Sequence, residues 1–140
     1  MKDKENPTKK YLSQIRLLDI QIRQKESELK EIRDYLESTA PLVSGDRVQT
    51  SPKDKIPAEV ALIVDLEEQV RRKKSILLQT KAKIINEIQS LDNPLYIDIL
   101  YKRYVEYKSL WEIAEEMRYS YYRIRHLHGI ALQEVKNVLK

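Results

Sequence analysis

The sequence predicts an all-α protein, in which a long N-terminal helical hairpin (an antiparallel coiled coil) precedes a C-terminal three-helix domain of the helix-turn-helix type. Apolar residues recur at heptad spacing in two long stretches, 34% of the 140 residues are charged, and only two are glycine. This composition favours long helices with solvated outer faces and few turns. We expect residues 1–91 to form the hairpin arm and residues 92–140 to form the second domain.

The first long helix is predicted from Tyr11 to Leu36. Its apolar residues occupy two heptad positions, with Lys25 as the one exception: Tyr11, Ile15, Leu18, Ile22, Leu29, Ile32 and Leu36. A stripe of this width is typical of a coiled-coil seam. Because a single helix cannot bury its own stripe, this helix must pack against another one.

The second long helix is predicted from about Pro57, which suits a first helical turn, to Leu91. Its seam repeats every seven residues and has further apolar support: Ile63, Val70, Leu77, Ile84 and Leu91, with Leu66, Ile76 and Ile88. Residues 38–57 are rich in Pro, Ser, Thr and Asp, which predicts a loop between the two helices. We expect the hairpin to form a homodimer or a higher oligomer through its remaining apolar surface.

Three capping signals divide the C-terminal region. Asn93 before Pro94 starts a helix that should reach Tyr104 or Val105. Ser109 and Glu112 have the spacing of a capping box, which starts a short helix over 110–117. Ser120 can cap the last helix, so 109–135 satisfies the helix-turn-helix description. The tyrosines in 101–107 are expected to surround Trp111.

The last helix carries the candidate binding residues. With Ile124 pointing inward, Tyr122, His126 and Gln133 point outward, and Arg123 and Arg125 flank them. Such side chains can contact base edges and phosphates in double-stranded DNA. The candidate DNA contacts are Ser120, Tyr121, Tyr122, Arg123, Arg125 and His126. Candidate contacts to the DNA backbone are Arg118 and an acid-free basic run, Arg71, Arg72, Lys73 and Lys74.

These residues carry a resemblance to a known family. The run from SLWEIAEEM through YSYYRIRHLHGIALQEV resembles region 4 of sigma-70-type factors, and LYIDILYKRYVEYKS resembles the leading helix of that domain. The resemblance covers about a third of the chain, and Arg118 departs from it, because glycine often occupies this turn position. With its long helical N-terminal half, the chain is also similar to ArpU- and RinA-type regulators of phage late genes.

The resemblance implies a sequence-specific transcription regulator, encoded by a phage or prophage, that activates late genes. RNA polymerase is then a candidate partner. Two other classes of function stay open. A small-terminase-like DNA-packaging subunit would also join a helix-turn-helix to a helical oligomerisation arm, and a coiled-coil adaptor would bind proteins without DNA. Native mass separates the first two, because a packaging subunit forms a closed ring of many copies.

Other classes of function find little support. The chain has no cysteine, no glycine-rich phosphate loop and no pattern of a catalytic Ser or Cys, so we expect neither an enzyme nor a cofactor. His126 and His128 point in different directions on a helix, so no metal site is expected. The polar N-terminus and the absence of a long apolar stretch predict a soluble cytoplasmic protein without membrane contact. The resemblance to phage regulators implies that this is the cytoplasm or nucleoid of a bacterial host.

Overall fold

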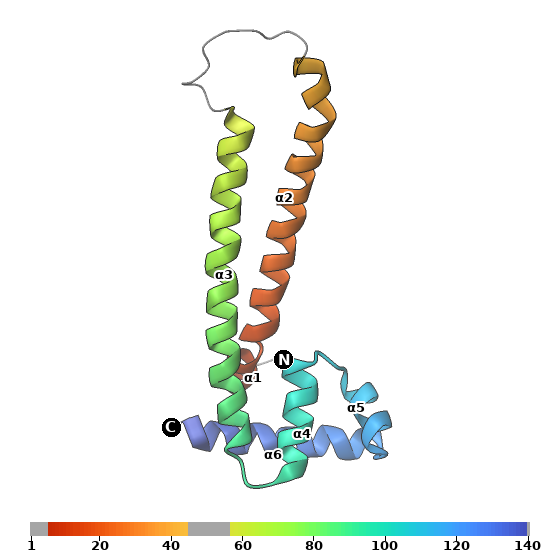
Figure 1. Cartoon of the computed structure of the whole chain (residues 1–140). Helices are drawn as coiled ribbons and strands as arrows, with labels where there is room; N and C mark the ends of the chain where they lie inside the picture. The colour runs from red at the N-terminus through yellow and green to blue at the C-terminus, as the bar shows by residue number, and fades with distance from the viewer. Residues whose placement is uncertain (1–5, 45–56, 140) are drawn as a thin grey trace. The chain divides into compact units, whose positions relative to one another are not determined.

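The computed structural model describes residues 6–44 and 57–139, and within them the chain is almost entirely helical and has no strands, which confirms the all-α prediction (Figure 1). The described part divides into two compact units. One contains the residues up to Leu18 together with those from Leu77 onward, and the other contains Asp19–Ile76. The elements are α1 (Pro7–Leu12), α2 (Gln14–Ser44), α3 (Ala58–Gln89), α4 (Pro94–Leu100), the π-helical turn η2 (Tyr101–Val105), α5 (Leu110–Met117) and α6 (Tyr121–Leu139).

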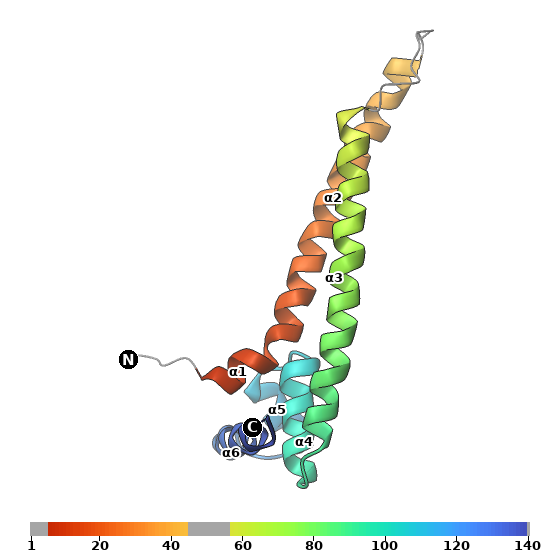
Figure 2. The ribbon, with the colours of Figure 1, turned by 90° about the vertical axis from the view of Figure 1, so that its left-hand side faces the viewer.

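The unit 19–76, called the hairpin unit below, consists of the greater parts of α2 and α3, which run antiparallel (Figures 1 and 2). Ion pairs join the two helices, from Lys74 Nζ to Glu26 Oε2 at 2.8 Å and from Arg33 to Glu67. Glu26 precedes Arg33 in α2, whereas its partner Lys74 follows Glu67 in α3, so the two helices run in opposite directions. Four seam residues are buried in this unit: Ile22, Leu29, Leu66 and Val70. Ile76 does not support the seam as predicted, because its side chain is exposed.

The boundaries of α2 differ from the sequence prediction at both ends. The helical region begins at Pro7, and Ser13 separates α1 from α2. The predicted loop 38–57 is wrong at its start, since α2 continues to Ser44. The hydroxyl groups of Ser38 and Thr39 donate to the carbonyl of Tyr35 at 2.9 and 3.2 Å, so they are satisfied within the helix. Residues 45–56 of the predicted loop lie outside the described part of the chain.

The second helix of the hairpin begins one residue later than its proline. Pro57 directly precedes α3, and its carbonyl accepts from the backbone N–H groups of Val60 and Ala61 at 3.0 and 3.1 Å. It therefore stands at the N-cap rather than at the first helical position.

The other unit, called the C-terminal unit below, has its largest core where six elements meet. The buried cluster draws on α1, the start of α2, the end of α3, α4 with η2, and α6: Leu12, Ile15, Ile84, Ile88, Leu91, Leu100, Tyr104, Val105, Ala131, Leu132 and Val135. Figure 2 shows α1 against α6. The ends of the long helices thus belong to this core, so the compact unit extends beyond the expected boundary at Leu91.

A second, smaller core joins α4, α5 and α6. Its buried members are Ile99, Ile113, Ala114, Ile124 and Leu127. Ala114 has a side chain of one methyl group, and its burial allows α6 to approach α5 closely. This core sets the position of the last helix against the short helix before it.

The π-helical turn directs a tyrosine into the larger core. In η2 the N–H of Glu106 donates to the carbonyl of Tyr101 at 3.1 Å, five residues earlier, which widens the helix by one residue. Tyr104 is buried there, and its hydroxyl lies 2.8 Å from Nε2 of His128 on α6. The expectation that Tyr104 packs around Trp111 is therefore wrong, since Trp111 is exposed.

Candidate nucleic-acid interface

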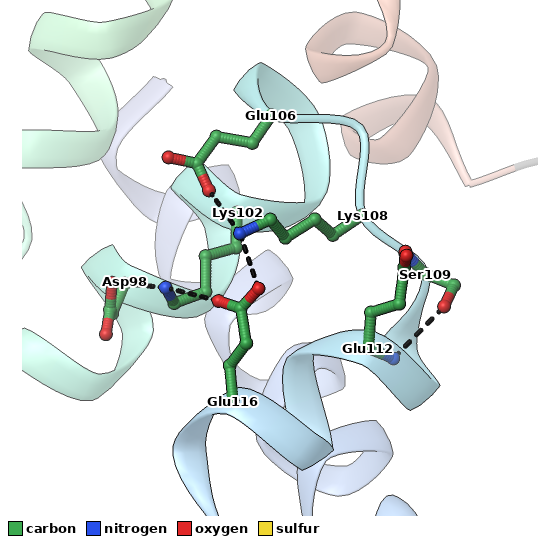
Figure 3. A network of polar contacts seen from close by, with 7 residues as sticks. All are labelled: Asp98, Lys102, Glu106, Lys108, Ser109, Glu112 and Glu116. Atoms are coloured by element: carbon green, nitrogen blue, oxygen red, sulfur yellow. Dashed lines mark hydrogen bonds and ion pairs between the residues drawn. The ribbon is translucent and has the colours of Figure 1, made fainter.

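The first helix of the candidate site, α5, starts with a complete capping box. The N–H of Glu112 donates to Oγ of Ser109 at 3.1 Å, and the N–H of Ser109 donates to Oε1 of Glu112 at 2.8 Å (Figure 3). Two N–H groups that would lack a helical partner are satisfied in this way. The capping box predicted from the spacing S-x-x-E is confirmed.

Ion pairs hold α5 against η2. Glu116 on α5 accepts from Lys102 at 2.9 Å and from Lys108 at 2.5 Å, while Lys108 also pairs with Glu106 at 3.1 Å (Figure 3). The ammonium groups of Lys108 and Lys102 lower the pKa of the Glu116 carboxyl. One acidic group near the candidate site is therefore neutralised within the fold.

The turn between α5 and α6 depends on a left-handed arginine. Arg118 has φ 63° and ψ 41°, the conformation in which glycine often ends a helix. The N–H of Tyr119 donates to the carbonyl of Ala114 at 3.0 Å, as in a Schellman motif. Tyr119 also packs against the smaller core. The turn thus has the left-handed geometry that glycine often supplies at this position, although its residue has a Cβ.

The recognition-helix candidate α6 is capped and packed as predicted. The N–H of Arg123 donates to Oγ of Ser120 at 3.1 Å. Ile124 is fully buried in the smaller core. The rest of the predicted stripe is buried as well: Leu127, Ala131, Leu132 and Val135. These contacts fix the rotation of α6 about its axis, and with it the direction of every other side chain.

The opposite face of α6 is exposed and polar. Tyr122 has 74% of its surface exposed, and Arg123, Arg125 and His126 are exposed as well. An open depression runs along this face. Its lining residues are Tyr122, Arg125, His126, Gly129, Ile130 and Gln133. The structure therefore places the six predicted contact residues together, within 120–126 at the N-terminal end of α6. Tyr121 is half-buried, and the other five are exposed.

Aromatic rings organise this end of α6. Cζ of Arg123 lies 4.9 Å from the centroid of the Tyr119 ring, a cation–π contact. On α5, the ring of Trp111 stacks on Tyr121, with centroids 4.0 Å apart and planes at 13°. Sequence reasoning missed Trp111 as a surface residue. The helical periodicity of α5 holds the signal, since Trp111 lies about 110° from the centre of that helix's buried stripe.

The two histidines of α6 have opposite environments. His126 is exposed, whereas His128 is buried against η2. Burial, together with the positive charges of Lys9 and Arg103, lowers the pKa of His128 to about 4, so its imidazole is neutral at pH 7. Burial also raises the pKa of Tyr104, its hydrogen-bond partner, to about 12. This pair is part of the core and does not face the candidate site.

Apart from Arg118 in the turn, the predicted backbone contacts lie on α3 in the hairpin unit. Arg71 and Arg72 both pair with Glu68, one turn earlier on the same helix. Lys74 pairs with Glu26, and Lys73 donates to Gln21 at 3.4 Å. Both arginines remain mostly exposed, and exposed ion pairs of this kind contribute little to stability. Their side chains can therefore exchange carboxylate partners for phosphates.

Over 6–44 and 57–139, no group of three or more His, Cys, Asp and Glu residues is arranged to hold a metal ion. No helix in the same ranges is long and apolar enough to cross a membrane. Comparison with protein-family models, with curated proteins and with solved structures found no match to this chain.

Proposed function

We propose that the chain is a sequence-specific transcription regulator that inserts α6 into the major groove of double-stranded DNA. The observation that carries this proposal is the division of α6 into two faces. Its buried face is held by two cores, and its exposed face presents Tyr122, Arg123, Arg125 and His126. A helix with its side chains is about 10–12 Å wide, which matches the major groove.

The chemistry of the exposed face suits base recognition. Arginine donates in pairs to guanine, and tyrosine and histidine add single hydrogen bonds or contacts to the thymine methyl group. In helix-turn-helix proteins the N-terminal residues of the second helix contact base edges while the first helix crosses the backbone. The residues at 120–126 occupy this N-terminal end of α6.

The charge distribution supports the same reading. Residues 117–133 contain no acidic residue, so the turn and most of α6 offer only neutral or positive side chains to a phosphate backbone. On α5, Glu116 is paired with two lysines and Glu112 is engaged in the capping box. A mildly basic chain with an acid-free stretch at the candidate site favours focused binding over general attraction to nucleic acid.

Selection of bound duplexes from a random pool, with the full chain, tests the proposal first. A recurring motif is expected, and binding without any motif would contradict sequence-specific recognition. On the selected duplex, Arg123→Ala combined with His126→Ala should weaken binding by about 1–3 kcal/mol for each lost base contact. Arg23→Ala, which removes one exposed arginine of the hairpin unit, is the control and should bind like the parent chain.

The hairpin supplies a second part of the proposal, self-association. Apolar side chains remain exposed on both of its helices: Ile20, Tyr35, Val60, Leu62, Val64 and Ile76. A dimer that covers such residues would read paired half-sites, and the spacing of the selected motif would report it. Native mass spectrometry of the full chain distinguishes this from packaging: a dimer supports the regulator, and a closed ring of many copies supports the DNA-packaging alternative.

The proposed role in late-gene activation rests only on the resemblance to ArpU- and RinA-type regulators. No contact in the structure bears on it. It is tested by transcription from a promoter that contains the selected motif, with host RNA polymerase and with or without the protein. Activation supports the assignment, whereas repression or no effect contradicts it.

A further inference from the structure

Trp111 is the only tryptophan of the chain, and 65% of its surface is exposed. It does not extend freely into solvent, because its ring is stacked on Tyr121 across the two helices of the helix-turn-helix. Tyr121 in turn meets the edge of Tyr122, with centroids 5.6 Å apart. We call Trp111, Tyr121 and Tyr122 the aromatic plate. It connects the N-terminal end of α5 to the exposed face of α6.

The stacking orders these rings before any partner binds. A side chain that is already held in one orientation loses little conformational freedom on binding, so its contacts contribute more to affinity. The outer side of the indole ring nevertheless stays exposed. A preorganised, exposed aromatic surface next to a binding helix is thus better explained as part of the binding surface than as part of the core.

From this arrangement we propose that the aromatic plate rests on the sugar–phosphate backbone beside the groove that α6 enters, with the indole N–H of Trp111 donating to a phosphate oxygen. The inference rests on the proposed DNA binding and adds a contact from α5. The indole nitrogen is a donor only, and a phosphate oxygen is an acceptor only. Tyr122 belongs to both the plate and the exposed face, so a duplex that covers that face comes close to Trp111.

One basic and two acidic side chains near the plate decide where a phosphate can lie. Arg125 follows Tyr121 by four residues, which places it one turn further along the same side of α6. Glu112, next to Trp111 in the chain, uses its carboxylate in the capping box. Glu115 lies one turn beyond Trp111 and would repel a phosphate. The contact is therefore placed at the N-terminal end of α5, away from Glu115.

The fluorescence of Trp111 tests the contact directly, because no other tryptophan contributes. The full chain is titrated with a short duplex of mixed sequence at low salt, and quenching by acrylamide is measured with and without DNA. Bound DNA should reduce the quenching several-fold. As a control, Trp111→Phe combined with Leu17→Trp moves the sole tryptophan to an exposed position on α2 outside both proposed interfaces, where DNA should leave the quenching unchanged.

Substitution gives an independent measurement. Trp111→Phe keeps a ring on Tyr121 but removes the donor, so affinity should fall about ten-fold for every duplex, as expected for one hydrogen bond to a charged group. The dependence of affinity on salt should not change, because an indole releases no counterions. Arg125→Ala should reduce that dependence instead. Leu17→Ala is the control for an exposed apolar residue outside both proposed interfaces, and circular dichroism checks that each variant is folded.

The possible results separate the two proposals. If DNA binds but leaves Trp111 equally accessible, and Trp111→Phe binds like the parent chain, the contact is refuted while DNA binding stands. If no duplex is bound, both are refuted. If DNA gives no protection but RNA polymerase does, the plate is a protein-binding surface and the DNA contact is again refuted.

Discussion

Acidification should destabilise the C-terminal unit through one side chain, His128. Its imidazole is buried, and desolvation together with Lys9 and Arg103 lowers its pKa from 6.5 to about 4. Between these two values the unfolded chain binds a proton that the folded chain does not bind. The free energy of unfolding therefore falls as the pH decreases through this window, by about 3 kcal/mol near pH 4. Above the unfolded pKa, His128 adds no dependence on pH.

Urea unfolding followed by circular dichroism, at neutral pH and near pH 4, measures this contribution. His128→Gln should be less stable than the parent chain at neutral pH, because it disturbs the contact with Tyr104, which lies 2.8 Å away. The difference should shrink by about 3 kcal/mol near pH 4, since the glutamine does not titrate. His126→Gln, an exposed change on the same helix, should follow the parent chain at both pH values. An equal difference between His128→Gln and the parent chain at both pH values would show that burial of His128 does not control acid stability.

Two further predictions concern the turn and the hairpin. Arg118→Gly should raise the free energy of unfolding by about 0.5–1 kcal/mol in thermal or urea unfolding, because glycine adopts φ 63° without strain. Lower stability would indicate that Arg118 makes contacts that outweigh this strain, and weaker binding to all duplexes would support its backbone role. Replacing Arg71, Arg72, Lys73 and Lys74 with Gln should lower DNA affinity for all sequences alike and reduce its salt dependence. An effect confined to the selected duplex would contradict a backbone role for these four residues.

The parts of the fold that the sequence predicts well are those governed by neighbouring residues. A helix cap needs a side-chain oxygen two or three residues before the backbone N–H group that donates to it. The hydrogen bonds of the caps at Asn93, Ser109 and Ser120 are all present. The buried stripe through Ile124 follows from helical periodicity in the same way. The exposed face of α6 could therefore be assigned residue by residue without knowledge of its neighbours.

The parts that the sequence does not predict depend on packing between distant segments. The break at Ser13 has no proline or glycine, and it occurs where Leu12 and Ile15 enter a core shared with Ile84 and Ile88. The π-helical turn of Tyr101–Val105 likewise adds one residue to a helical turn and aims Tyr104 at His128. Neither feature repeats along the chain, so neither leaves a periodic signal.

Trp111 shows how two sequence signals can conflict. Its size suggests burial among other aromatic residues, whereas its position on α5 places it away from the stripe of Ile113 and Ala114. In a helix of eight residues, one buried stripe decides which side chains can reach the core, so position outweighs size. A large apolar residue that periodicity places outside the core is then a candidate for contact with a partner. The same reasoning applied to Tyr122 gave an exposed residue at the candidate interface, and the stack through Tyr121 joins the two into one surface.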